Sequence, residues 1–319
     1  MTARAIGLLL GHGLDHLFGD PQRHHPVAWF GSLAERLERR IHRADSSNER
    51  LVGAGATVLL VGGSAALGAL IDVTTTHRPM ARVLTTATAT WIVLGGRSLD
   101  REGAAIADHL DADDIPAARR RIRHLVGRDP ENLDATDLAR AATESLAENT
   151  SDAVVAPLVW GALGGCGGLL AHRAANTLDA MWGHRTPRWE RFGWAAARLD
   201  DVLNLPGSRL TAVLITALAP TINGRVRDAW HMWRRDAPKH PSPNAGPVEA
   251  ALAGAIGVQL GGQNTYAGTV EDRGTLGDGP PPDAAALQRT RTLTRRVGHA
   301  AAVVAAAVAG WPWVIRALP

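Results

Sequence analysis

Long stretches without a charged side chain constrain this fold more than any other feature of the chain. Residues Leu51–Ile71 contain no Asp, Glu, Lys or Arg over 21 positions, and Val297–Ile315 contains none over 19. About 20 apolar residues in a helix cross the hydrocarbon core of a bilayer. We therefore predict that both stretches are membrane-spanning helices, although the whole chain is 20% charged and its average composition resembles that of a soluble enzyme.

Weaker uncharged stretches are shorter or carry proline and amide side chains. They are Val83–Gly96, Ala153–His172, Leu210–Gly224 and Ala250–Val270. Strand patterns are scarce, and the alanine- and arginine-rich stretches between these segments have helical periodicity. The prediction is an all-α, multi-pass integral membrane protein with broken or re-entrant segments. We expect a single domain over residues 1–319, with a polar helical region inserted at about 97–152.

Arginine placement indicates how the segments are oriented. Arginines are dense before residue 51, sparse from 72 to 82 and dense again from 97 to 152, so the positive-inside rule places the N-terminus in the cytoplasm. Both flanks of Ala153–His172 are basic, and a simple crossing would leave one of them outside. We predict that this segment does not simply cross, and that the active site faces the cytoplasmic side of the cell membrane.

Composition excludes several classes of protein. Cys166 is the only cysteine, which excludes an internal disulfide and a thiolate zinc cluster. Lys239 is the only lysine, and the arginines that supply the remaining positive charge are dispersed, so no nucleic-acid partner is indicated. The chain also lacks the GxxxxGK[ST] phosphate loop, so any nucleotide site is not of the Walker type.

An acidic motif precedes the stretch that begins at residue 153. Glu144, Glu148 and Asp152 recur every fourth residue, so a continuous helix would carry them on one face. Together with the amide of Asn149 they could hold Mg²⁺, which takes oxygen ligands and commonly shares them with phosphates. The alternative is a solvated helix face followed by an N-cap at Ser151.

Two further motifs combine arginine with carboxylates and amides. The guanidinium fork suits carboxylates and phosphates, and the neighbouring side chains could orient it or bind a metal. Ion pairs along one helix explain Asp200 and Asp201 equally well. The residues are Arg173, Asn176 and Asp179 in HRAANTLDAMWGHR, and Arg198, Asp200, Asp201 and Asn204 in FGWAAARLDDVLN.

A proline-rich loop, DAPKHPSPNAGPVEAAL, is the least ordinary stretch of the chain. Its prolines restrict the backbone, and short polar side chains with one ammonium suit an anionic ligand. A second turn, near the N-terminus, places Asp20 and His25 beside prolines. The polar residues of the loop are Lys239, His240, Ser242 and Asn244, and Glu249 lies on the helix predicted after it.

Six motifs, taken in order, resemble those of the CbiB/CobD family of cobalamin biosynthesis, the adenosylcobinamide-phosphate synthases. They are GDPQRHHPV, RRRIRHLVGRD, ESLAENTSDAVVAPL, RAANTLDAMWGH, FGWAAARLDDVLN and KHPSPNAGPVEAALAGAIGVQLGG. The resemblance runs from about Asp15 to Gly277. Two places depart from the family pattern, and we expect both to lie in loops: residues 206–209 read Pro-Gly-Ser-Arg instead of Pro-Ala-Arg-Leu, and Arg273-Gly274 replaces Arg-Pro.

The resemblance implies an integral membrane enzyme of the vitamin B12 pathway. Such an enzyme joins (R)-1-aminopropan-2-ol, or its O-phosphate, to the propionate carboxylate of adenosylcobyric acid in an ATP-dependent, Mg²⁺-requiring amide ligation. The expected cofactors are thus ATP and Mg²⁺. The expected partners are the corrinoid, the aminopropanol substrate and the lipid bilayer, with a homo-oligomer left open.

On this resemblance we assign roles by residue type. Glu144, Glu148 and Asp152 would bind Mg²⁺–ATP. Asp200 and Asp201 would be alternative ligands or the base that takes the ammonium proton, with His240 and Glu249 as further catalytic candidates. Lys239, His240, Ser242 and Asn244 would bind phosphate. The candidates for the remaining substrate and cofactor contacts are Arg119, Arg128, Arg173, Arg198, Asn149, Asn176, Asp179, Asp20 and His25.

A membrane transporter and an AmpE-like regulatory membrane protein are the alternatives. Polar motifs beside broken apolar segments also form the substrate sites of transporters near the bilayer midplane. The loop at 239–244 together with the acidic motif favours the enzyme, because a passive sensor would not need these groups.

Overall fold

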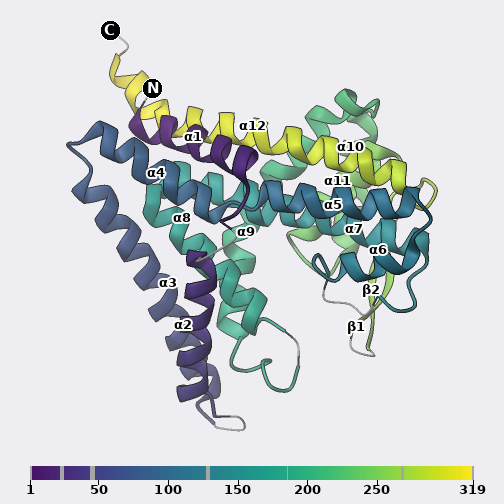
Figure 1. The fold of residues 1–319 in the computed structure, drawn as a ribbon, viewed down its shortest axis with the longest axis horizontal. Coiled ribbons are helices and arrows are strands. Elements are labelled where there is room, and N and C mark those ends of the chain that lie inside the picture. Colours follow the sequence, from purple (N-terminus) through teal and green to yellow (C-terminus); the bar gives the residue numbers. More distant parts are fainter. Residues whose placement is uncertain are drawn as a thin grey trace. The chain divides into compact units, whose positions relative to one another are not determined.

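The computed structural model describes residues 2–21, 25–43, 47–126, 130–184, 186–266 and 269–317, except for the side chains of 264–271 and of 312–317 (Figure 1). The chain forms two compact units that alternate along the sequence. The first contains Met1–Gly95, Ala156–Asn204 and Ala302–Pro319, and the second contains Gly96–Val155 and Leu205–Ala301. The polar region predicted at 97–152 falls in the second unit.

The first unit is built from helices. They are α1 (Ala3–Phe18), α2 (Pro26–Ile41), α3 (Glu49–Thr74), α4 (Pro79–Val93) and α8 (Ala156–Trp182), with the first part of α9 (Trp194–Leu218) and the last part of α12 (Ala284–Ala317). One cluster of its core contains Leu60, Leu178, Trp182 and Phe192, all buried. The loop predicted between Thr74 and Pro79 is confirmed, because α3 ends and α4 begins at these residues.

Small residues bring helices α1 and α4 into close contact. A Cβ atom on Gly7 would lie 2.6 Å from Cβ of Thr86, and one on Gly11 would lie 2.4 Å from Cβ of Thr90. The contacts repeat every four residues on both helices, so one turn of each helix faces one turn of the other. This is how helices pack in membranes, where close approach of small residues replaces the hydrophobic effect as the source of attraction.

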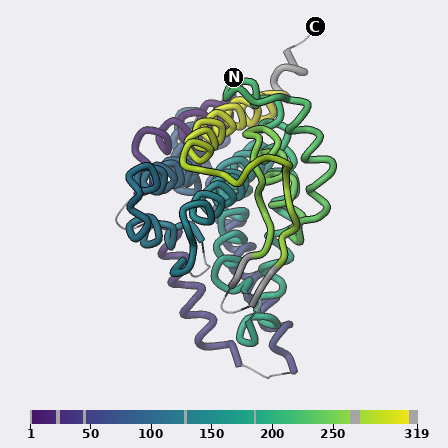
Figure 2. The backbone as a smooth tube through the Cα atoms, turned by 90° about the vertical axis from the view of Figure 1, so that its right-hand side faces the viewer, coloured from purple at the N-terminus to yellow at the C-terminus, as the bar shows by residue number. Residues whose placement is uncertain are grey.

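The second unit combines helices with one hairpin. Its elements are α5 (Gly96–Asp111), α6 (Ile115–Ile122), α7 (Ala135–Thr150), a π-helical turn (Ser151–Val155), the remaining parts of α9 and α12, two short 3₁₀ helices (Ala219–Ile222 and Ala237–Lys239), α10 (Val226–Asp236), α11 (Ala245–Ile256), β1 (Leu260–Tyr266) and β2 (Thr269–Leu276). The antiparallel strands are visible in Figures 1 and 2. Buried Ile106, Ile122, Leu138 and Leu287 belong to its core.

Within the part of the chain that the structure describes, three helical segments are long and apolar enough to cross a membrane: Glu49–Thr74, Ala135–Trp182 and Trp194–Ile222. The predicted all-α membrane fold is therefore confirmed. The helical segments that contain Ala153–His172 and Leu210–Gly224 are longer than these uncharged stretches, because polar helical residues precede each stretch without a loop. The span predicted at Val297–Ile315 lies in α12, which is not among the three, and its side chains beyond Trp311 lie outside the described residues.

Helix α8 is broken at Gly165, as expected for the segment Ala153–His172. Gly165 has φ 61° and ψ −144°, which no helix accommodates. A Cβ atom on Gly168 would lie 2.2 Å from the carbonyl oxygen of Trp160, although residues eight apart are separated by about 12 Å in a straight helix. The chain therefore turns back sharply here, and the broken segment that we predicted is confirmed.

Two charged side chains satisfy the backbone at this break. Nη1 of Arg4, on α1, donates to the carbonyl oxygen of Ala162 at 3.2 Å, while Oδ2 of Asp72, on α3, accepts from the N–H of Gly167 at 3.4 Å. A cation thus faces the carboxyl end of the first half-helix, and an anion faces the amino end of the second. Such bonds are needed because lipid offers the freed backbone groups no partners.

The uncharged stretch Ala250–Val270 is divided, because α11 ends at Ile256 with Gly257 in the left-handed region and a β-hairpin follows. Two expected loops were wrong: residues 206–209 lie inside α9, and Arg273-Gly274 lies in β2. The predicted proline-rich loop is present only up to Asn244, because α11 begins at Ala245, and a short 3₁₀ helix forms at 237–239.

Candidate functional sites

A buried chain of hydrogen bonds joins α8 to α9 in the first unit. Nδ2 of Asn204 donates to Oδ2 of Asp200 at 2.8 Å, and Nδ2 of Asn176 approaches Oδ1 at 3.5 Å. On its other side, Oδ1 of Asn204 lies 2.9 Å from Nε2 of His172. Asp200, Asn204 and His172 are all buried. The predicted residues Asn176 and Asp200 are therefore brought together.

The donors and acceptors in this series of hydrogen bonds determine which nitrogen of His172 carries a proton. The amide of Asn204 presents its nitrogen, which only donates, to Asp200 and its oxygen, which only accepts, to His172. Nε2 of His172 is then the protonated nitrogen. Nδ1 of the same ring is buried and has no hydrogen-bond partner among the described residues, which agrees with a neutral imidazole protonated at Nε2 alone.

Asp20, His25 and Arg173 form a second group in the first unit. Nδ1 of His25 accepts from the N–H of Val27 at 3.1 Å and so caps α2. Burial lowers the pKa of His25; the negative charge of Asp20 opposes this shift, and the positive charge of Arg173 adds to it. The three predicted residues thus interact, which supports their common assignment to a binding role.

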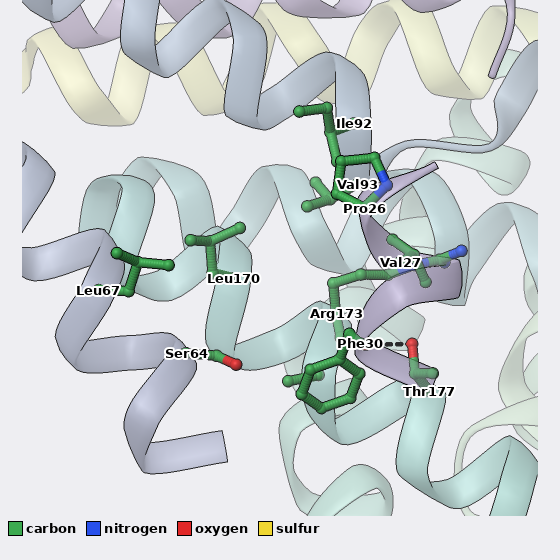
Figure 3. A pocket seen from close by; sticks show the side chains of 11 residues that line it. Pro26, Val27, Phe30, Ser64, Leu67, Ile92, Val93, Leu170, Arg173 and Thr177 are labelled. Carbon is green, nitrogen blue, oxygen red and sulfur yellow. Dashed lines mark hydrogen bonds between the residues drawn. The ribbon is translucent and has the colours of Figure 1, made fainter. Parts of the chain in front are cut away.

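The aliphatic part of Arg173 lines a cavity of about 170 Å³ (Figure 3). The other walls are mainly apolar and include Phe30, Leu67, Val93 and Leu170. Figure 3 shows the stem of Arg173 along the cavity and its guanidinium beyond it, beside Val27 in the first turn of α2. The charged group therefore lies beside the first turn of α2 and not in the apolar space.

Asp201 and Arg198 behave differently from Asp200. Nη1 of Arg198 lies 3.7 Å from Oδ2 of Asp201, and their side chains are 70% and 39% exposed. This is the ion pair along one helix that we considered as the alternative, and exposed pairs of this kind contribute little stability. Asp179, one turn after Asn176 on α8, lies near enough for its negative charge to interact with the carboxyl group of Asp200.

Asp236 organises the proline-rich loop of the second unit. Oδ1 accepts from Nζ of Lys239 at 2.7 Å, and Oδ2 accepts from the N–H of Gly277 at 2.8 Å. Arg235 adds hydrogen bonds at 2.7 and 2.8 Å. Burial alone would raise the pKa of Asp236, but these bonds outweigh burial and hold the pKa well below its ordinary value. The loop therefore begins at a fixed anion.

The end of the loop before α11 is held by residues of α9 and by side chains of the loop itself. Oγ of Ser242 accepts from the N–H groups of Asn244 and Ala245, at 3.3 and 3.1 Å, and thereby caps α11. Oδ1 of Asn244 accepts from Oγ of Ser208 at 3.1 Å, and Nη1 of Arg209 donates to Pro243 O at 2.8 Å. Ser242 and Asn244 thus have structural roles, while Lys239 and Arg209 are exposed cations.

His240 faces Glu249 inside the unit. Its Nδ1 accepts from the N–H of Ser242 at 3.0 Å, and its Nε2 lies 3.9 Å from Oε2 of Glu249, whose side chain is fully buried. Burial lowers the pKa of His240 to about 4; the positive charge of Arg273 adds to this shift, and a bond with Ser242 opposes it. The imidazole is therefore neutral at pH 7.

The acidic motif of α7 is not a solvated face. Glu144 is 3% exposed, and its Oε1 accepts from the N–H of Gly261 at 2.8 Å, which fixes the start of β1. The π-helical turn begins at Ser151, which is therefore not an N-cap, and it changes the register before Asp152. Nδ2 of Asn149 donates to the carbonyl oxygen of Ser145 at 2.9 Å.

No group of three or more His, Cys, Asp or Glu side chains suited to a metal ion is assembled within the described ranges. The assignment of Glu144, Glu148 and Asp152 to Mg²⁺ therefore stays a prediction. Arg119 donates through Nε to the carbonyl oxygen of Leu133 at 3.0 Å. Arg128 lies outside the described residues.

Residues 8–294 match the model of the family described as CobD/Cbib protein. The chain belongs to this family.

Three curated members of the CobD/Cbib family illustrate how much of the chain is shared. The cobalamin biosynthesis protein CobD of Mycobacterium tuberculosis (strain H37Rv) is 52% identical over 95% of both chains. The proteins of the same name from Stutzerimonas stutzeri (strain A1501) and Geobacter metallireducens are each 44% identical, over 97% and 92% of this chain and 95% and 93% of their own. No solved structure matches this member of the family. The CobD/Cbib protein described here has a role in cobalamin biosynthesis.

Three residues of this CobD/Cbib protein's sites were missed as site residues: Ser208, Arg209 and Asp236. Ser208 and Arg209 follow a noted motif, but their hydrogen-bond partners are distant in the chain. Asp236 is the first residue of the noted proline-rich stretch and resembles an ordinary charged residue at a helix end. Only the fold reveals that it binds Gly277, 41 residues away.

Proposed function

We propose that this protein catalyses the ATP-dependent ligation of (R)-1-aminopropan-2-ol, or its O-phosphate, to the propionate carboxylate of adenosylcobyric acid. Membership in a family of cobalamin biosynthesis proteins supports the pathway and favours an enzyme over a transporter or a regulator. The observation that carries the proposal is the loop at 237–244. Buried Asp236 and Asn244 hold this loop by hydrogen bonds, and Lys239 in the loop and Arg209 beside it on α9 are exposed. Fixed exposed cations are suited to phosphate groups.

The chemistry requires activation of the carboxylate. One carboxylate oxygen attacks the terminal phosphorus of ATP, ADP leaves, and an acyl phosphate forms. The amine nitrogen then attacks the acyl carbon, and phosphate departs with the electrons of the broken C–O bond. The proton of the ammonium passes to a base, so amide, ADP and phosphate are the products. Fixed positive charge and held reactants are the main contributions that a protein can make to such steps.

Asp200 is our candidate for the base. Its carboxylate is buried and accepts hydrogen bonds from the amides of Asn176 and Asn204, which carry no charge. Neutral donors orient a carboxylate without cancelling its charge, so it keeps its attraction for the ammonium proton. Asp201 is a weaker candidate because it pairs with Arg198 at an exposed position.

Arg173, with Asp20 and His25 nearby, is our candidate for the corrinoid carboxylate or amides. Mg²⁺ would neutralise the phosphates of ATP; such ions commonly bind one or two carboxylates besides phosphate and water. Half-buried Glu148 and Asp152 suit this role better than Glu144, because one oxygen of Glu144 is bonded to Gly261.

The experiment is a direct assay of purified protein in detergent with adenosylcobyric acid, each form of the amine, and Mg–ATP. We expect an amide product by mass spectrometry and an equal amount of ADP. Absence of product and of ADP with both amines contradicts the proposed reaction. Asp200→Asn and Lys239→Met should lose most activity, whereas Glu35→Gln, which neutralises an exposed carboxylate paired with Arg39, should not. Full activity of Asp200→Asn would contradict the site but leave the reaction standing.

A further inference from the structure

Helix α10 has one exposed face in the second unit. Val226, Arg227, Trp230, His231 and Arg234 are exposed, and their spacing of three or four residues places them side by side on the helix. The opposite face packs on α11, where a Cβ atom on Gly254 would lie 2.8 Å from Cα of Ala229. We call the five exposed residues the α10 face.

The α10 face combines apolar and cationic side chains. Trp230 is 50% exposed and Val226, one turn before it, is 46% exposed, so the two form a continuous apolar strip. The guanidinium of Arg234 lies 5.9 Å from the ring centre of Trp230. Tryptophan prefers the headgroup level of a bilayer, and arginine beside it reaches lipid phosphates.

Connection to a candidate membrane span limits where α10 can lie. The apolar segment Trp194–Ile222 ends three residues before α10 begins at Val226. Three residues reach at most about 10 Å even when extended. This link is not extended, because Asn223 adopts the left-handed conformation with φ 63° and its N–H is bonded to Pro220 O at 3.3 Å. Helix α10 therefore starts close to the end of the span.

The charges near the face have one predominant sign. Arg225, just before the helix, is exposed and adds to Arg227 and Arg234. The acidic residues of α10 do not offset them on this face, because Asp228 is half-buried and Asp236 is buried against Arg235 and Lys239. An anionic surface is the complementary partner.

We propose that the α10 face binds the anionic headgroups of the lipid bilayer, so that α10 is an interfacial helix. This inference does not depend on the ligation reaction. It also has a consequence for the loop at 237–244: Asp236 ends α10 and holds both Lys239 and Gly277, so a helix fixed at the membrane surface fixes the start of the loop with it.

The test uses the full chain in phosphatidylcholine vesicles, with or without phosphatidylglycerol. Single cysteines replace Val226 or Trp230 and carry an environment-sensitive fluorophore; Cys166 is buried, so it can be kept or changed to alanine. We expect lipids with a nitroxide at the headgroup to quench both labels, and more so with phosphatidylglycerol. A label at Ala112, in the exposed acidic turn 111–114, is the control that should not be quenched.

Removing charge tests the electrostatic part. The double variant Arg227→Ala, Arg234→Ala should lower the ratio of membrane-bound to unbound α10 on anionic vesicles by roughly 30-fold at low salt. In the protein that keeps both arginines, high salt should lower the same ratio. Labels at 226 and 230 that are quenched no more than the label at 112 would overturn the proposal. So would labels that are shielded from aqueous iodide but not quenched by any nitroxide lipid, since another protein surface would then cover the face.

Discussion

At the scale of single residues, three buried polar side chains are held by uncharged side-chain donors or by backbone N–H groups. Asp200 is held by amides, His240 by the N–H of Ser242, and Glu144 by the N–H of Gly261. A buried polar group that loses its partner costs free energy without regaining water. Substitutions that remove one partner should therefore be more harmful than substitutions that keep the hydrogen bond.

His172 offers a test of this kind, because Nε2 is its bonded nitrogen. His172→Leu should lower the free energy of unfolding by about 1–3 kcal/mol, since Asn204 then has an unsatisfied oxygen. His172→Gln, which can still donate from its amide, should recover part of this loss. Thermal unfolding in detergent measures both variants. Equal stability of the two would contradict a role for the hydrogen bond.

His240 should make the protein sensitive to acid. Its pKa falls from 6.5 to about 4 on folding, so the unfolded chain takes up a proton at a higher pH than the folded chain. The stabilisation is complete above pH 6.5, is lost as the pH falls from 6.5 to about 4, and reaches about 3 kcal/mol over that window. Protonation would also turn Nδ1 from an acceptor of the Ser242 N–H into a donor, and the carbonyl oxygen of Ser242 lies 3.4 Å from it.

Denaturation of the wild type and of His240→Gln across this pH range measures the effect. The difference in free energy of unfolding between the two proteins should shrink as the pH falls through the window. A difference that does not depend on pH would contradict the prediction.

At the scale of elements, the break in α8 shows how a helix can stop and restart in an apolar segment. Gly165 supplies the turn. Arg4 donates a hydrogen bond to a freed carbonyl group of one half, and Asp72 accepts one from a freed N–H of the other. All three come from different helices of the first unit, so the break depends on their packing. The same logic explains the close contact of α3 with α8, where a Cβ atom on Gly68 would lie 2.4 Å from the carbonyl oxygen of Cys166.

Gly165→Ala should destabilise the protein strongly. Its φ of 61° and ψ of −144° cost an alanine roughly 1–3 kcal/mol, and the new Cβ atom would lie 2.4 Å from Oδ2 of Asp72. Gly164→Ala is the matched control, because a Cβ atom there meets nothing within 4 Å. We expect thermal unfolding at a clearly lower temperature for the first variant only. Similar unfolding of the two would show that the turn is not required.

At the scale of the whole molecule, the orientation of the chain in the membrane follows from the broken segment. A span that turns back at Gly165 need not carry its two flanks to opposite sides. Both flanks bear arginines, which favour the cytoplasmic side. We therefore retain the prediction that the motifs before and after this segment face one compartment.

Cysteine labelling in intact cells measures this orientation. Thr136 and Ala180 are exposed and lie before and after the broken segment, so cysteines there can react. A membrane-impermeant maleimide should label both positions from the same side. Labelling from opposite sides would mean that the segment crosses the membrane.

The sequence by itself determined the class of fold and the family. Charge-free stretches require a membrane or a large core whatever their surroundings, and ordered motifs such as RAANTLDAMWGH and KHPSPN identify a family without coordinates. It also predicted that the segment Ala153–His172 does not simply cross, because both of its flanks are basic. These properties are local, so they can be read along the chain.

Only the tertiary structure decided what the polar residues do. Asp200 and Asp201 are neighbours with equal chemistry, yet one is buried against two amides and the other pairs with Arg198 at the surface. Glu144 and Asp236 bind the backbone of Gly261 and Gly277, far away in the chain. Such roles depend on burial and on distant donors, because the energy of a hydrogen bond is set by what surrounds it. No spacing along the sequence contains that information.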